Sequence, residues 1–107
     1  MEWRVEILNE TVEGELLALP DDRQAQFVRI GRHIRQAGLQ AVRVPYVKHL
    51  EGKLWKIRMT GRDGIARALY VAALGRRVVV VRVFIKKTQK TPQAEIDLAL
   101  RRAKEVR

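Results

Sequence analysis

The sequence contains no cysteine and only two histidines, His33 and His49. Without cysteine the chain can form neither a disulfide nor a thiolate metal site, and two histidines leave little room for a zinc site. A chain without cysteine fits the reducing cytoplasm of a bacterium or an archaeon. We therefore expect a cytoplasmic protein that uses no metal and no other cofactor.

Long apolar segments are also missing from the chain. No apolar run approaches the roughly 20 residues that a membrane-spanning helix needs, and the N-terminal stretch MEWRVEIL lacks the pattern of a signal peptide. These absences argue against a membrane protein. The sequence also shows no carboxylate pair, no Ser-His-Asp set and no glycine-rich phosphate loop, so it does not indicate those routes to catalysis.

Acidic residues are few compared with basic ones. The chain has 22 Lys and Arg against 12 Asp and Glu, which gives a net charge of +10 and a pI near 10.9. This balance predicts attraction to nucleic acid or to an acidic partner. Because 47% of the 107 residues are hydrophobic, we expect residues 1–107 to form one folded domain with a modest core.

The spacing of apolar residues and the capping residues predict the element order β–α–α–β–β–β–α. The expected fold is α+β, with an antiparallel sheet that carries its helices on one side. In chain order, the prediction is an antiparallel edge strand over residues 3–7, a helix ending near Leu19, a helix from Asp21 to Gly38, one helical turn over 47–50, three strands within 54–87 and a last helix that Thr91 caps.

Cations interrupt the three consecutive strands. Lys56 and Arg58 share one face of the first strand, while Arg67 lies alone in the apolar run Ile65–Leu74. The third strand is also apolar, except for Arg82 and the terminal pair Lys86-Lys87. A strand rich in Val, Ile and Leu is typical of a sheet that is buried on both faces. An arginine inside such a strand destabilises the fold unless an anion binds it.

The expected register brings several of these cations together. A loop over residues 61–64 places Arg58 opposite Arg67, and a two-residue turn at Gly75-Arg76 places Arg67 opposite Phe84. Arg82 and Lys86 are then diagonal neighbours of Arg67, although a slip of one residue would replace Lys86 by Lys87. Like charges that face each other destabilise a sheet. One such cation alone is typical of a solvated surface, but the group indicates a phosphate-binding face.

Further arginines lie on the predicted helices, and a basic helix face is most often simply solvated. As a hypothesis, we assign a subset of these basic residues to sequence-independent contacts with RNA phosphates. The second helix carries Arg23, Arg29, Arg32 and Arg35 opposite its apolar stripe. On the helices, the residues assigned to RNA contacts are Arg29, Arg32, Arg35, Arg101 and Arg102. In and after the third strand, they are Arg82, Lys86 and Lys90.

Three stretches of the chain, LEGKLWKIR, RALY and VFIKKTQKTPQAEIDLALRRAKE, resemble the phage-derived HigB-like branch of the RelE toxin superfamily. The resemblance covers roughly the C-terminal two-thirds of the chain, and the predicted order of elements fits throughout. It implies the toxin of a type II toxin–antitoxin pair, a ribosome-dependent endoribonuclease that cuts mRNA in the ribosomal A site. It also implies a cognate helix-turn-helix (HigA-like) antitoxin, with operator DNA bound only through that antitoxin.

The same resemblance implies a set of catalytic residues. Lys56 and Arg58 match the basic pair of the family, and Arg67 matches the strand arginine that contacts the scissile phosphate. Lys87, or alternatively Lys86, matches the basic residue that ends the last strand. The chain departs from RelE at the tyrosine that follows this residue, because Thr91, Pro92 or Gln93 stands there. Tyr70 does not replace it, since it points to the opposite face from Arg67.

Metal-independent RNA cleavage needs attack by the 2′-hydroxyl on the adjacent phosphorus, removal of a proton, and stabilisation of the growing negative charge. Arg58 and Arg67 suit the last task, because a guanidinium can bind two phosphate oxygens. Lys56 can act as the base if neighbouring cations lower its pKa, and His49 is the second candidate.

Two other functions remain open at this point. The chain could be a basic module that binds RNA or the ribosome and blocks translation without cutting, or its basic surface could serve only to hold an acidic partner. An antitoxin with acidic residues could cover the basic face directly or prevent entry into the A site by its bulk, and we favour the second arrangement.

Overall fold

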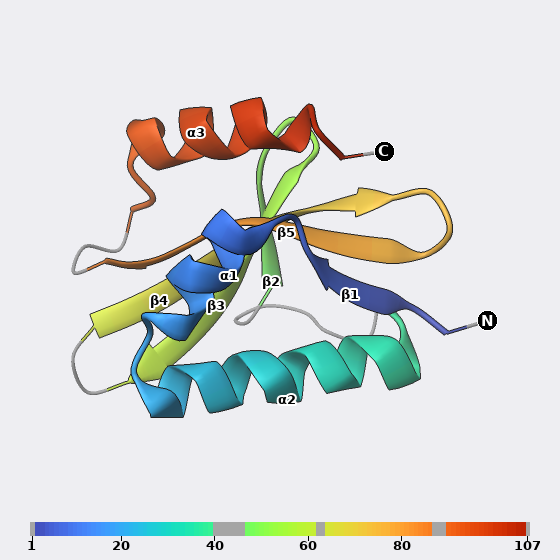
Figure 1. Ribbon diagram of the computed structural model, residues 1–107, viewed down its shortest axis with the longest axis horizontal. Coiled ribbons are helices and arrows are strands. Elements are labelled where there is room, and N and C mark those ends of the chain that lie inside the picture. The colour runs from blue at the N-terminus through green and yellow to red at the C-terminus, as the bar shows by residue number, and fades with distance from the viewer. Residues whose placement is uncertain (1, 40–46, 62–63, 87–89, 107) are drawn as a thin grey trace.

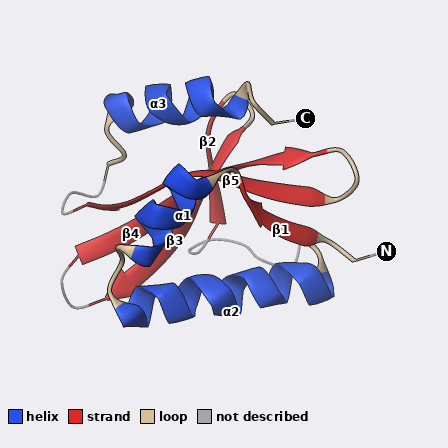
Figure 2. Cartoon of the chain, viewed as in Figure 1, coloured by secondary structure: helices blue, strands red, loops and turns tan. Residues whose placement is uncertain are grey.

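The computed structural model describes residues 2–39, 47–61, 64–86 and 90–106. Within these ranges the chain forms five strands and three helices, arranged as a sheet between helical layers (Figures 1 and 2). Their order is β1 (Arg4–Ile7), α1 (Glu10–Leu17), α2 (Asp21–Ala37), β2 (Val47–Glu51), β3 (Leu54–Gly61), β4 (Gly64–Ala73), β5 (Arg77–Lys86) and α3 (Gln93–Ala103).

The strands form a single sheet in the order β1-β5-β4-β3-β2. The pairs from β5 to β2 are antiparallel, but β1 runs parallel to β5, with Val5 beside Val78. The predicted edge position of β1 is confirmed, and its predicted antiparallel direction is wrong. The alternation of Trp3, Val5 and Ile7 shows which face of the strand is buried, but it carries no information about the direction of the partner.

Residues 47–50 form part of strand β2 and not the predicted helical turn. Val47 pairs with Ile57 and His49 with Trp55, and the chain reverses at Gly52, whose φ of 56° suits a residue without a side chain. Pairing with the long strand β3 overrides the weak local preference of the short segment VKHLE.

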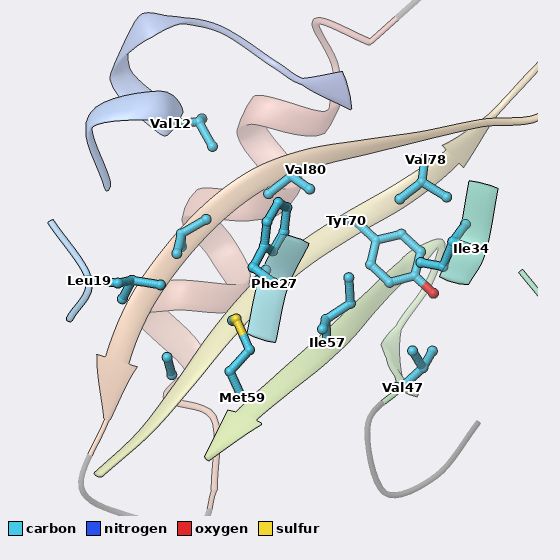
Figure 3. Close-up of a cluster of buried hydrophobic side chains, with 13 residues drawn as sticks. Val12, Leu19, Phe27, Ile34, Val47, Ile57, Met59, Tyr70, Val78 and Val80 are labelled. Carbon is cyan, nitrogen blue, oxygen red and sulfur yellow. The ribbon is translucent and has the colours of Figure 1, made fainter. Parts of the chain in front are cut away.

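Both faces of the sheet are covered, so the prediction of helices on one side is wrong. On one face, Val12 of α1 and Phe27 and Ile34 of α2 pack against residues such as Ile57, Tyr70 and Val80 (Figure 3). On the other face, α3 packs Ile96, Ala99 and Ala103 against the sheet, and the sheet contributes Leu54, Leu69, Val71, Val79, Val81 and Phe84. The helices therefore bury both apolar faces of β4 and β5, as those sequences require.

The β4–β5 hairpin differs in detail from the expected two-residue turn. Ala73 pairs with Arg77, so three residues form the turn, and both Gly75 and Arg76 have positive φ. A bulge then leaves Val81 without a partner between the pairs Tyr70–Val80 and Leu69–Arg82. The extra residue in β5 offsets the longer turn, so Arg67 still faces Phe84 as predicted.

Side chains from the helices complete the sheet edges where β1 and β2 stop. The amide of Gln26 in α2 hydrogen bonds with both the N–H and the carbonyl oxygen of Thr60 in β3. At the other edge, the Val83 N–H donates to Glu15 of α1 at 3.1 Å, and Arg102 of α3 donates to the Val81 carbonyl at 2.9 Å. These bonds satisfy backbone groups that no neighbouring strand reaches.

Candidate functional site

The cations of the strands converge on the sheet face that α3 partly covers. Arg58 in β3 faces Arg67 in β4, and the neighbouring row pairs Lys48 with Lys56. Lys86 pairs with Ile65 and lies on the same side, because it is two residues beyond Phe84, the partner of Arg67. The register predicted from the sequence for Arg58 and Arg67 is therefore confirmed. We call Lys48, Lys56, Arg58, Arg67 and Lys86 the basic face.

Lys48 is the member of this face that the sequence analysis missed. The local pattern around it favours a helical turn, which leaves its side chain without a predicted face. Once β2 pairs with β3, Lys48 stands directly opposite Lys56. The detectable signal is the alternation of Val47, Lys48 and His49 before a turn that contains Gly52, but it extends over too few residues to separate a strand from a helix.

Arg67 is the most buried residue of the basic face, with 2% of its surface exposed. Its Nη1 donates a hydrogen bond to the hydroxyl of Thr91 at 3.0 Å, immediately before α3. Burial, together with the charge of Arg58, lowers the pKa of the Arg67 guanidinium from its ordinary value. A phosphate can therefore reach this guanidinium directly only if its surroundings move, whereas the charge itself acts from within the sheet.

Lys56 and Arg58 are half-buried and stand nearer to solvent. Burial lowers the pKa of the Lys56 ammonium below 10.5, and the charges of Arg67, Lys48 and Arg58 lower it further. Among the described residues, the Nε of Arg58 is buried and has no hydrogen-bond partner. An anion placed at this point would therefore meet an arginine with hydrogen-bonding capacity that the described residues leave unused.

Two of the residues predicted to contact RNA, Arg82 and Arg102, form ion pairs within the protein. Arg82 forms a two-point contact with Glu95 of α3 at 2.7 and 3.0 Å, and its Nη1 lies 2.8 Å from Glu15 of α1. Arg102 lies 2.9 Å from the same Glu15 carboxylate. The hydrogen bond with Glu95 raises the pKa of Arg82, so its charge is fixed in place. These contacts give Arg82 and Arg102 a structural role that joins α1, β5 and α3.

The remaining predicted residues are distributed over both sides of the sheet. Arg29, Arg32 and Arg35 are exposed on α2, on the opposite side from the basic face. Arg101 is exposed on α3, and Lys90 is exposed shortly before that helix. Arg23 departs from the predicted solvated stripe, because only 1% of its surface is exposed and it packs against Gly61. Lys87, one of the predicted catalytic residues, lies outside the described residues.

Two alternative proton-transfer groups point away from the basic face. His49 shares the face of Trp55, which it contacts edge-on at 5.0 Å, and its Nε2 lies 2.6 Å from the Gly52 carbonyl. Tyr70 belongs to the core cluster beneath α2, and burial raises the pKa of its hydroxyl (Figure 3). Of the candidates that the sequence offers for the general base, Lys56 is the one on the basic face.

Thr91 does not cap α3 as predicted. The residue before the first helical turn is Pro92, and no side chain caps the helix there. Thr91 is instead buried, with 6% of its surface exposed, and its hydroxyl is used by Arg67. The described residues contain no group of three or more side chains arranged to hold a metal ion. None of the helices they form is long and apolar enough to cross a bilayer.

Comparison with known proteins places this arrangement in a family. The sequence profile of the family described as "Phage derived protein Gp49-like" matches residues 14–104. The chain belongs to this Gp49-like family. No curated protein sequence matches the chain.

Solved structures show which fold this Gp49-like protein has. A double mutant of the Escherichia coli toxin RelE in its free state is similar with a TM-score of 0.67 and 17% identity, over 95% of this chain and 98% of that one. The archaeal RelE of the RelE–RelB complex from Pyrococcus horikoshii gives 0.58 and 21%, over 79% of this chain and 96% of that one. The RelE-like fold that the sequence motifs indicated is therefore confirmed.

Proposed function

We propose that this Gp49-like protein is the toxin of a toxin–antitoxin pair and that it inhibits translation by cutting mRNA on the ribosome. The observation that carries the proposal is the direct opposition of like charges on one sheet face, Lys48 with Lys56 and Arg58 with Arg67. Such pairs destabilise a sheet and are expected where an anion compensates them. The likeness to RelE structures supports the same function.

The geometry suggests a division of roles in the reaction. Arg58 binds the non-bridging oxygens of the scissile phosphate and stabilises the charge that develops on them. The amine of Lys56 accepts the proton of the attacking 2′-hydroxyl, for which its lowered pKa is suited. Arg67 supplies positive charge from the buried position across the strand pair. Lys48 and Lys86, at the two ends of the basic face, hold the neighbouring phosphates. Lys87 stays the proposed catalytic residue at the end of the last strand, with Lys86 as its alternative.

Attack by the 2′-hydroxyl predicts a definite pair of products. The bond from phosphorus to the 5′-oxygen breaks, and the proton that Lys56 took from the 2′-hydroxyl passes to this leaving oxygen. One fragment then carries a 2′,3′-cyclic phosphate and the other a 5′-hydroxyl. No step in this scheme requires a group beyond the protein and the RNA. The runner-up function, a module that binds the ribosome and blocks translation without cutting, uses the same basic face but predicts intact message.

The test is to mix the purified protein with ribosomes programmed with a 5′-labelled mRNA and to map the RNA ends. We expect cleavage at the A-site codon, and we expect Lys56→Met and Arg58→Met each to slow it about a hundredfold or more. Lys104→Met is the matched control, because Lys104 is exposed beyond the last turn of α3. Stalled ribosomes with intact message would favour the runner-up.

The partners follow from the same proposal. A protein with a net charge of +10 that damages translation needs a neutralising partner in its own cell, and acidic residues on that partner would speed the encounter. We propose a helix-turn-helix (HigA-like) antitoxin, which also mediates any contact with operator DNA, and a cytoplasmic location for the pair. We favour inhibition by bulk, in which case Arg58→Met leaves antitoxin affinity unchanged; a collapse of that affinity would indicate direct cover of the basic face.

A further inference from the structure

The bond between Thr91 and Arg67 joins the loop before α3 to the middle of strand β4. Both residues are almost fully buried, and the hydroxyl oxygen accepts from Nη1 of Arg67 at 3.0 Å. Water therefore competes little for this hydrogen bond, and an arginine that lost the acceptor would keep a buried donor to satisfy. The bond holds a charged group in a position that the sheet alone would not favour, since Arg58 stands directly opposite.

The hydroxyl of Thr91 forms no capping hydrogen bond with α3, the helix that follows. A threonine at this place would ordinarily cap the helix, yet the N-cap residue is Pro92, and no side chain forms a capping bond there. Pro92, with φ of −65°, adds stiffness to the connection. Ile96 and Ala99 then anchor α3 on the sheet, so the position of Thr91 is set by the packing of the whole helix.

We propose that Thr91 is a positioning residue, which acts by fixing the guanidinium of Arg67 at its buried place in the basic face. This inference rests on the proposed cleavage function and adds to it a residue outside the predicted catalytic set. A fixed charge stabilises a transition state better than a mobile one, because it does not have to reorganise during the reaction. Loss of the hydroxyl should therefore slow the chemical step and leave the affinity for RNA unchanged.

The variants that test this are Thr91→Val, which keeps the shape and removes the acceptor, and Thr91→Ser, which keeps the acceptor. Thr11→Val is the matched control, because Thr11 is exposed on α1. In single-turnover cleavage on programmed ribosomes, we expect Thr91→Val to be slower by about tenfold to a hundredfold. Thr91→Ser and Thr11→Val should stay within about threefold of the parent. Binding to ribosomes that carry a 2′-O-methylated, non-cleavable mRNA should not change in any of them.

A double-mutant cycle separates positioning from a general loss of structure. If Thr91 acts through Arg67, the double variant Arg67→Met/Thr91→Val should be no slower than Arg67→Met alone. If the two effects multiply, or if Thr91→Val cleaves at the parental rate, the proposal is wrong. Methionine is chosen because a buried arginine replaced by an apolar side chain of similar length leaves little cavity.

A measurement on the free protein keeps this proposal separate from the cleavage function. The Nη1–H proton that Arg67 donates to Thr91, followed by nitrogen-15 NMR, should exchange slowly with water in the parent and in Thr91→Ser. It should exchange at least about tenfold faster in Thr91→Val. Unchanged exchange would overturn the positioning role even if the RNA is cut. Faster exchange in a protein that cuts no RNA would support the role of Thr91 in holding Arg67 and overturn only the proposed function.

Discussion

The charge of Lys56 lies in surroundings that disfavour it. It faces Lys48 on β2, has Arg58 on its own strand and Arg67 on β4, and the row ends at Arg82, which is paired with Glu95. Burial and these charges lower the pKa of Lys56 below its ordinary 10.5. The protonated lysine therefore destabilises the folded state, and the free energy of unfolding should rise as the pH rises through the lowered pKa toward 10.5.

The substitution Lys48→Met should raise the pKa of Lys56, because it removes one of the facing charges. If Lys56 is the base, the cleavage rate increases with pH as Lys56 loses its proton, and this rise should move to higher pH in the variant. Activity at neutral pH should then fall severalfold and recover in alkaline buffer. Lys53→Met, on the exposed β2–β3 turn, is the control. A rate profile that does not move would rule out this electrostatic role for Lys48.

Position 61 requires glycine because the side chain of Arg23 occupies the space of a Cβ, and not because of the backbone conformation of Gly61. A Cβ at this position would collide with the guanidinium of Arg23, whose side chain is buried. Gly61→Ala should therefore destabilise the fold by about 1–3 kcal/mol. Arg23→Met in the same chain should recover most of that loss, because methionine lacks the guanidinium that the methyl group meets.

Chemical denaturation with urea measures both effects. Gly14→Ala is the control, because Gly14 lies in α1 and an added methyl group would meet nothing within 4 Å, and this change should stabilise by about 0.5–1 kcal/mol. Equal stabilities of Gly61→Ala and the parent would mean that Arg23 moves aside without loss.

The elements of the fold divide into those that local pattern determines and those that pairing determines. The register of Arg58 with Arg67 is predictable, because apolar alternation fixes the faces of β3 and β4 and the short loop leaves few alternatives. The predicted pairing of Arg67 with Phe84 is also correct, but only because the bulge at Val81 offsets a turn of three residues. Strand β2, and with it Lys48, depends on its partner and cannot be predicted from the local sequence.

Burial of cations is the other feature that the local sequence does not reveal. Sequence pattern alone assigns Arg23, Arg67 and Arg82 to solvated or substrate-binding positions, whereas the structure buries the first two and pairs the third with Glu15 and Glu95. Such outcomes depend on acidic or small residues that are distant in sequence. The same holds for Thr91, whose local context predicts a helix cap.

Glu15 joins three elements at the free edge of β5, so its removal should have a large effect. Its carboxylate accepts from the Val83 N–H and lies within 3 Å of Arg82 and Arg102. Glu15→Ala should lower the free energy of unfolding by about 2–4 kcal/mol, because two partly buried guanidinium groups and a backbone donor lose a partner together. Glu13→Ala, an exposed position on the same helix, should change stability by less than about 0.5 kcal/mol. Similar losses for the two variants would contradict the role of Glu15.

At the scale of the whole molecule, positive charge lies on both sides of the sheet. The basic face adjoins α3, whereas Arg29, Arg32 and Arg35 are exposed on α2 across the sheet. A single strand of mRNA on the basic face cannot also reach the α2 arginines. These arginines are therefore proposed to meet ribosomal RNA, so that the ribosome holds the protein from one side while the message lies on the other.

Replacing Arg29, Arg32 and Arg35 together by Gln should weaken ribosome binding and flatten its salt dependence. Each lost phosphate contact should reduce the slope of log K against log salt by about 0.7–0.9. The cleavage rate at saturating protein should stay at the parental value, because the basic face is unchanged. Replacement of Arg58 should do the opposite, with slow cleavage and nearly normal binding. If the triple variant binds with parental affinity and slope, the α2 arginines are only a solvated surface and the ribosome is held through the α3 side alone.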